Sequence, residues 1–110
     1  PERVGLLLYN IEDFDCEILV LHSLEEGKGM GTALVDTLRA ALKETAIQRV
    51  WLITTNDNLP ALKFWQKHGF VLKALHVDSI QEARRLKPQI PIVGHEGIPV
   101  RDEIELEWKR

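Results

Sequence analysis

The arrangement of residues 17–32 places the tightest constraint on the fold of this chain. Residues 17–24 form an apolar, strand-like run, and the turn that follows it holds three alternating glycines, Gly27, Gly29 and Gly31. From Met30 onward apolar residues recur every three or four positions, which predicts an amphipathic helix from about Gly29 to Thr45. Amides in the first turn of a helix have no partner within the helix and lie at the positive end of its dipole. The run therefore predicts a strand, a glycine turn and a helix N-terminus that can hold a phosphate.

Two common phosphate-binding loops do not match this turn. A dinucleotide-binding fingerprint requires G-x-G-x-x-G, but Thr32 occupies the position of its third glycine. A nucleoside triphosphate loop ends in Gly-Lys-Ser/Thr, whereas Lys28 precedes Gly29 and no such tripeptide occurs in the chain. Two interpretations stay open on the turn alone: a phosphate site of another kind, and a turn whose glycines serve only the backbone geometry.

The segments around the turn predict a mixed sheet. Residues 4–10 are a second apolar run, separated from residues 17–24 by polar residues, which indicates an antiparallel hairpin with a loop of several residues at 12–15. Residues 49–55 read as a strand that follows the helix after a short connection. A strand, helix, strand unit of this kind makes its two strands parallel.

The second half of the chain predicts two short helices and two strands. Asn58 suits the N-cap of a helix from near Leu59, and Gly69 suits the left-handed residue that ends it. Ser79 and Glu82 form a capping-box pattern for another helix, whose apolar face is expected to hold Ile80, Ala83 and Leu86. The remaining segments are expected to be a strand at 70–75, an extended loop at 88–101 and a last strand at 102–108.

Composition narrows the class of protein. A length of 110 residues with 45% hydrophobic content suits one small domain, and a net charge of -3 argues against a basic surface for nucleic acid. The single cysteine, Cys16, cannot form an internal disulfide, and four histidines without ligand-like spacing do not indicate a metal site. We find neither a signal-peptide pattern nor a run long enough to cross a bilayer, so we expect a cytoplasmic protein with no membrane partner.

Two motifs resemble those of the GCN5-related N-acetyltransferase (GNAT) family. Residues 26–31 read Glu-Gly-Lys-Gly-Met-Gly and are similar to the family pattern Gln/Arg-x-x-Gly-x-Gly/Ala. Residues 58–70 resemble the family's Asn-x-x-Ala-x-x-Phe-Tyr-x-x-x-Gly-Phe stretch. The resemblance covers residues 4–70 closely and 102–108 more loosely. It implies an α/β fold with a GNAT-like mixed sheet and a splayed parallel strand pair. We expect residues 1–110 to be a single GNAT-type domain that lacks the family's N-terminal first strands and helices.

The resemblance also implies acetyl-CoA as cosubstrate and assigns residues to it. The strand end at Leu21, His22 and Ser23 is expected to pair its free backbone groups with the pantetheine arm. The pyrophosphate is expected to lie against the amides of residues 27–31, and Asn58 is expected to contact the coenzyme from the next helix. The residues implied at the pyrophosphate are Gly27, Lys28, Gly29, Met30 and Gly31, with Thr32 next to them.

Two positions depart from the family pattern and bear on catalysis. Glu26 brings a negative charge where the family has glutamine or arginine. Trp65 stands where many members have the tyrosine that protonates the leaving thiolate, and an indole N–H is no acid near neutral pH. His68 can replace that acid, although an interaction with the end of its own helix is simpler. Glu17 is the candidate general base, with a solvated charge as its alternative.

Three functions follow as hypotheses. The leading one is acetyl transfer from acetyl-CoA to a primary amine. A second is an acyl-CoA-binding or regulatory module without catalytic activity, which the tryptophan at position 65 favours. A third is a structural domain that forms a homodimer through an exposed edge strand at residues 4–9.

Overall fold

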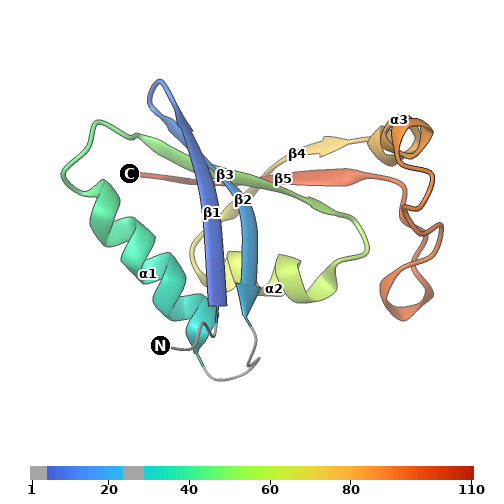
Figure 1. Ribbon diagram of the computed structural model, residues 1–110, viewed down its shortest axis with the longest axis horizontal. Coiled ribbons are helices and arrows are strands. Elements are labelled where there is room, and N and C mark those ends of the chain that lie inside the picture. Colours follow the sequence, from blue (N-terminus) through green and yellow to red (C-terminus); the bar gives the residue numbers. More distant parts are fainter. Residues whose placement is uncertain (1–4, 24–28) are drawn as a thin grey trace. The chain divides into compact units, whose positions relative to one another are not determined.

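The computed structural model describes residues 5–23 and 29–110, shown in Figure 1. Its strands form one mixed sheet in the order β1-β2-β3-β5-β4, so the expected α/β fold with a mixed sheet is confirmed. The chain divides into two compact units, one reaching to Leu52 and including Lys109 and Arg110, the other comprising residues 53–108. That residues 1–110 form a single domain stays a prediction. The described elements are β1 (Gly5–Glu12), β2 (Asp15–Ser23), α1 (Met30–Leu42), β3 (Arg49–Thr55), α2 (Leu59–Lys67), β4 (Val71–His76), α3 (Ser79–Leu86), the short 3-10 helix η1 (His95–Gly97) and β5 (Glu103–Lys109).

The hairpin of the first unit is tighter than its sequence predicts. Strands β1 and β2 pair antiparallel up to Glu12 and Asp15, which leaves only Asp13 and Phe14 in the turn. The expected loop of several residues at 12–15 is therefore wrong. The polar residues at the strand ends continue the ladder, because an exposed strand end does not need apolar side chains to pair. Asp13 makes the turn with a positive φ of 54°, which aspartate tolerates better than most residues.

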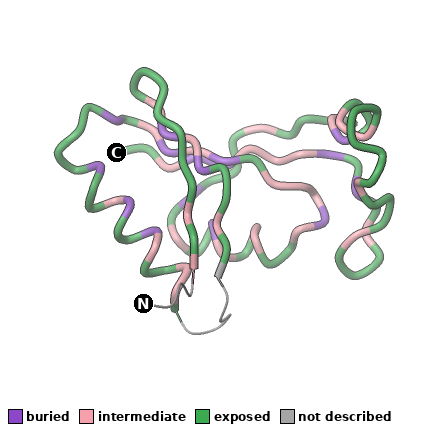
Figure 2. The backbone as a smooth tube through the Cα atoms, in the orientation of Figure 1, coloured by how far each residue is buried: buried purple, intermediate pink, exposed green. Residues whose placement is uncertain are grey.

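Helix α1 packs on this hairpin through one face. It contacts both β1 and β2 and runs alongside them in Figure 1. Its buried side chains are Val35, Leu38 and Leu42. Figure 2 shows buried stretches recurring along the helix. The helix ends at Leu42 rather than at Thr45, because Thr45 turns back and donates from Oγ1 to the Leu42 carbonyl at 2.7 Å.

In the second unit, α2 begins and ends as predicted. The Asn58 side chain accepts a hydrogen bond from the Ala61 amide at 3.2 Å, and Pro60 lies in the first turn. Gly69 follows the helix with a φ of +88°. The next strand, β4, pairs antiparallel with β5, and the register skips one residue of β4 between Leu72 and Ala74.

The capping box predicted for α3 is not present in the structure. Ser79 is the first helical residue rather than the N-cap, and its buried Oγ has no hydrogen-bond partner. The N-cap is Asp78, whose backbone N–H donates to Asp102 Oδ1 at 2.8 Å. The N-terminus of α3 is thus fixed by Asp102, the residue before β5. No local sequence pattern predicts this contact. Leu86 is 87% exposed, so of the expected apolar face only Ile80 is fully buried.

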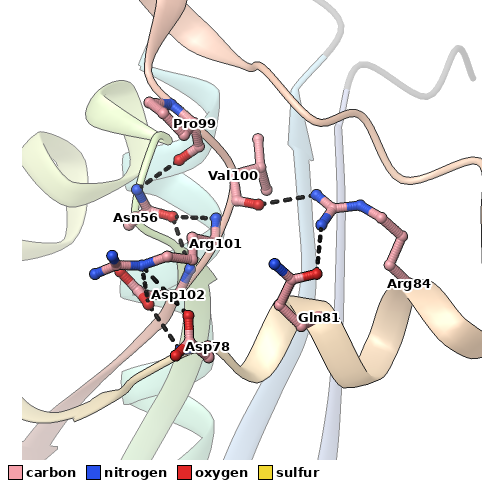
Figure 3. Close-up of polar contacts among 8 residues, drawn as sticks. All are labelled: Asn56, Asp78, Gln81, Arg84, Pro99, Val100, Arg101 and Asp102. Carbon is pink, nitrogen blue, oxygen red and sulfur yellow. Dashed lines mark hydrogen bonds and ion pairs between the residues drawn. The ribbon is translucent and has the colours of Figure 1, made fainter.

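The loop between α3 and β5 is held by polar side chains (Figure 3). Arg84 donates to the Val100 carbonyl oxygen at 2.9 Å, as Figure 3 shows. It also donates to the carbonyl oxygens of Pro91 at 2.9 Å and Ile90 at 3.2 Å. From the other side, Asn56 accepts from the amides of Arg101 and Asp102 and donates to the Pro99 carbonyl. Backbone groups that an irregular loop would leave unpaired are satisfied in this way, which fixes the loop in one conformation.

Candidate active site

The N-terminus of α1 is built to receive an anion. Gly29 is its N-cap, with a φ of +76°, no side-chain cap and no acidic residue in the following turn. Among the described residues, the Ala33 amide donates to the Gly29 carbonyl at 3.0 Å, and the amides of Met30 and Gly31 precede this bond. Exposed Thr32 follows them. The expected contacts of Gly27 and Lys28, and the departure at Glu26, lie outside the described residues.

Strand β2 changes its pairing just before this helix. It pairs in parallel with β3 over residues 15–17, whereas its antiparallel pairing with β1 continues to Ser23. Within the pairing with β1, the register passes from Ile18 to Val20, so Leu19 is an extra residue in β2. A bulge bends a strand and increases its twist. Leu21 and His22 lie beyond the bulge opposite Leu7 and Leu6, respectively. The sequence did not predict the bulge.

Glu17 lies at the end of the parallel pairing, beside Trp51 of β3. Both line a pocket of about 280 Å³ in the first unit. The other lining residues are the acidic or polar Asn10, Glu12, Asp13 and Asp15, together with the apolar Phe14. One cation offsets part of this charge, because Arg49 contacts Asp15 at 3.6 Å and lies 5.2 Å from the Trp51 ring centroid. The pocket thus favours a cationic or neutral polar occupant over an anionic one.

Helix α2 carries the two expected residues of the second unit. Asn58 uses its Oδ1 as the helix cap, which leaves its Nδ2 donor without a hydrogen-bond partner among the described residues. Trp65 is 5% exposed, with its ring edge-on to Phe64 at 4.9 Å and to Phe70 at 5.0 Å. The three- and four-residue spacing of Ala61, Leu62 and Trp65 predicts that Trp65 faces the sheet and the bound thioester rather than solvent, and its burial confirms that it does not face solvent.

His68 takes the simpler of its two expected roles. Its Nδ1 lies 2.8 Å from the Phe64 carbonyl, and its ring stacks on Phe64 at 4.2 Å. This contact satisfies a carbonyl of the last helical turn, where a histidine also interacts well with the helix dipole.

The sequence did not predict a further polar pair that involves His95, one of the four histidines without ligand-like spacing. His95 Nδ1 lies 2.9 Å from Oδ2 of Asp57, a buried residue just before α2. The two residues are far apart in the sequence, and only the loop held by Arg84 and Asn56 brings them together. Within residues 5–23 and 29–110, no group of three or more His, Cys, Asp or Glu side chains could hold a metal ion. None of the helices described is long and apolar enough to span a bilayer.

Comparison with known proteins identifies the family. The sequence model of the acetyltransferase (GNAT) family matches residues 1–70. YxbD of Bacillus subtilis (strain 168) is 47% identical over 103 residues, which cover 94% of this chain and 65% of YxbD. The chain therefore spans slightly less than two thirds of that relative's length.

Solved structures agree on the fold. A Bacillus subtilis acetyltransferase in complex with CoA matches with a TM-score of 0.83 and 23% identity. The match covers 99% of this chain and 70% of that acetyltransferase. A GNAT family acetyltransferase from Elizabethkingia anophelis with acetyl-CoA bound has a TM-score of 0.84 and 20% identity, with the same coverage. The match of the family model to more than half of the chain establishes that this chain belongs to the acetyltransferase (GNAT) family.

Proposed function

We propose that the chain binds acetyl-CoA and transfers its acetyl group to a primary amine, in the cytoplasm as the sequence predicts. The observation that carries the proposal is the N-terminus of α1, where a glycine N-cap without a side-chain cap exposes the amides of Met30 and Gly31. Such a terminus suits a pyrophosphate, because both the unpaired amides and the helix dipole favour negative charge. The bulge at Leu19 and the short parallel pairing of β2 support a pantetheine arm along Leu21, His22 and Ser23.

An amine is the acceptor class that best suits the pocket beside Glu17. Alkyl amines are cationic near neutral pH, and three further carboxylates of Glu12, Asp13 and Asp15 line the same pocket. The reaction also needs a free amine as nucleophile, so a group must remove a proton before attack. Glu17, half-buried in the pocket wall, is one candidate for that role.

Calorimetric titration with acetyl-CoA tests the coenzyme site. Gly31→Asp should abolish binding, because it adds a side chain and a negative charge in the first turn of α1. Ala41→Asp is the matched control, since it adds the same charge at an exposed position of the same helix, in its last turn. Equal binding by the parent and Gly31→Asp would reject the assignment.

The packing of Trp65 favours a second candidate, a module that binds acyl-CoA without turnover. Its ring lies between Phe64 and Phe70 as a core residue and supplies no acid for a leaving thiolate. A screen of amines for release of the coenzyme thiol separates the two. Release supports the transferase, whereas calorimetric binding without release supports the module.

A homodimer through β1 is the remaining alternative. This strand is at the end of the sheet order, and Leu6, Leu8 and Ile11 on it are exposed. Apolar edge strands associate readily. Sedimentation velocity should therefore show self-association that Leu8→Lys weakens; a parent that stays monomeric at high concentration would exclude this interface.

A further inference from the structure

The pairing of β1, β2 and β3 arranges the side chains of the Glu17 pocket in two rows on one face of the sheet. In the inner row, Asn10 lies opposite Glu17, and Glu17 lies opposite Trp51. In the outer row, nearer the hairpin turn, Glu12 lies opposite Asp15. Residues two apart on a strand point to the same face, and the two rows are therefore about 7 Å apart. The pocket thus has two ends, with Glu17 at one end and the other carboxylates toward the turn.

The opposite face of β2 is packed against α1. Cys16 and Ile18 alternate with Asp15 and Glu17 along the strand, so they point to the other face of the sheet, and both are buried. Helix α1 contacts this strand and buries an apolar face of its own. The pocket therefore opens on the face that α1 leaves free, and its occupant approaches from that side.

The wall of the pocket already accommodates one cation of the chain itself. The Arg49 guanidinium contacts Asp15 at 3.6 Å and lies 5.2 Å from the Trp51 ring centroid, so it is held by a carboxylate and an aromatic face together. This ion pair neutralises part of the charge of Asp15. Glu12 and Asp13 are exposed, and neither forms an ion pair within the part of the chain that the structure describes. Their negative charge is therefore available to a cationic occupant.

The spacing and size of the pocket favour a small molecule with two separated charges. Among the described residues, no three acidic, histidine or cysteine side chains converge closely enough to hold a metal ion, so the pocket does not suit a single point charge. Its volume of about 280 Å³ is at the small end of the range for ligand pockets. Phe14 and Trp51 add apolar surface to the same lining, which suits the methylene groups of a spacer.

We infer that the acceptor is a short aliphatic diamine, with one nitrogen beside Glu17 and the second ammonium near Glu12 and Asp13. This inference rests on the proposed acetyl transfer. The nitrogen beside Glu17 loses one proton to that carboxylate, the candidate base, and attacks the thioester carbonyl, so that the C–N bond forms and the C–S bond breaks. The second proton lost by this nitrogen ends on the coenzyme thiolate, which leaves as the thiol. The distal ammonium keeps its charge throughout, which makes Glu12 and Asp13 specificity-determining residues.

The experiment compares kcat/KM for two amines of equal length. Putrescine has two terminal ammonium groups, and pentylamine carries a methyl group in place of the second one. We expect the parent to prefer putrescine by about tenfold, because two exposed ion pairs together contribute roughly that factor. Added salt should weaken this preference, since it screens exposed charges.

A double variant, Glu12→Gln with Asp13→Asn, removes the two charges at the outer end of the pocket. Asparagine tolerates the positive φ of position 13, so the hairpin turn is kept. The preference for putrescine should fall to about twofold or less, while kcat/KM for pentylamine stays nearly unchanged. The matched control, Asp36→Asn with Glu44→Gln, removes two charges at exposed positions on α1 and just after it, and should keep the preference of the parent.

Two readouts keep the test independent of folding. Turnover of pentylamine reports whether the double variant is folded and active, and the salt dependence is measured on the parent alone. Equal kcat/KM for the two amines in the parent, or a preference for putrescine that the active double variant keeps, would overturn the diamine while leaving acetyl transfer intact. A parent that binds acetyl-CoA but acetylates no amine would instead overturn the proposed function and this inference with it.

Discussion

Arg110 donates a hydrogen bond from Nη1 to the carbonyl oxygen of Leu42, the last residue of α1, at 2.8 Å. The same nitrogen reaches the carbonyls of Ile47 at 3.0 Å and Thr45 at 3.1 Å, and Nη2 reaches that of Lys43 at 3.1 Å. The final carbonyls of a helix have no partner within it, and a guanidinium meets them with both charge and donors. Arg110 is therefore the C-terminal cap of α1 within the first unit.

Replacing this cap should destabilise the first unit. We expect Arg110→Ala to lower the free energy of unfolding by about 1–3 kcal/mol, because it removes charge-assisted hydrogen bonds to several carbonyls at once. Arg110→Lys should lose less, since an ammonium keeps the charge but not the planar arrangement of donors. Chemical denaturation measures both.

The control is Arg85→Ala. Arg85 is exposed and, among the residues that the structure describes, forms an ion pair with Glu82 alone, at 3.5 Å, so its loss should change stability by about 0.5 kcal/mol or less. A loss for Arg110→Ala as small as that of the control would show that water caps the helix equally well.

A second prediction concerns Arg84, which binds the loop between α3 and β5 in the second unit. We expect Arg84→Ala to free the carbonyls of Pro91 and Val100 and to loosen the loop more than the unit as a whole. Hydrogen exchange of the Val100 amide, which donates to Ile92 at 2.9 Å, should then become faster, while Arg85→Ala should leave it unchanged. Unaltered exchange would mean that Asn56 alone holds the loop.

The Asp57 carboxylate predicts a pH dependence of stability. Burial raises its pKa, but hydrogen bonds from Thr55 and His95 outweigh this effect and lower the pKa from the ordinary value of 3.8 to about 2. The stability it contributes is therefore complete above about pH 4 and is lost as the pH falls toward 2. Asp57→Asn should remove this dependence. The gap in unfolding free energy between parent and variant should narrow between pH 4 and pH 2 by on the order of 2 kcal/mol.

Urea denaturation of both proteins across this range measures the gap, and other acidic groups cancel in the difference. Asp102, whose pKa is lowered chiefly by Arg101, is among these. A constant gap between pH 4 and pH 2 would show that the folded protein does not depend on the charge of Asp57.

Local sequence patterns predicted the elements whose determinants lie within a few residues. Asn58, Pro60 and Gly69 fixed the limits of α2, and the start of α1 near Gly29 was expected from the spacing of its apolar residues. The patterns failed where a distant contact decides the outcome. At the start of α3, the Asp78 amide donates to the distant Asp102 side chain rather than to a neighbouring residue. Asp57 contacts His95, which lies in a loop that Arg84 holds by hydrogen bonds.

The features of the candidate site likewise fall into those that local sequence patterns predict and those that depend on distant contacts. The helix N-terminus at Gly29 and the buried position of Trp65 follow from motif and periodicity. The bulge at Leu19 does not, because it arises from a difference in register between two strands, and neither strand carries a signal for it on its own. The Glu17 pocket likewise depends on how β1, β2 and β3 pair.

The last prediction concerns Trp65 and the protonation of the leaving thiolate. By the resemblance to the family, Trp65→Tyr puts a phenol where many members have the tyrosine that protonates the thiolate, so we expect turnover to rise on the order of tenfold or more on an amine that the parent accepts. Affinity for acetyl-CoA should change little. The smaller ring loses part of the contact with Phe64 and Phe70, so stability should fall by about 1–2 kcal/mol. Trp65→Phe is the matched control, because it makes a similar cavity without supplying the hydroxyl. Equal turnover for Trp65→Tyr and Trp65→Phe, together with weaker acetyl-CoA binding in both, would show that Trp65 serves packing alone and that another group delivers the proton.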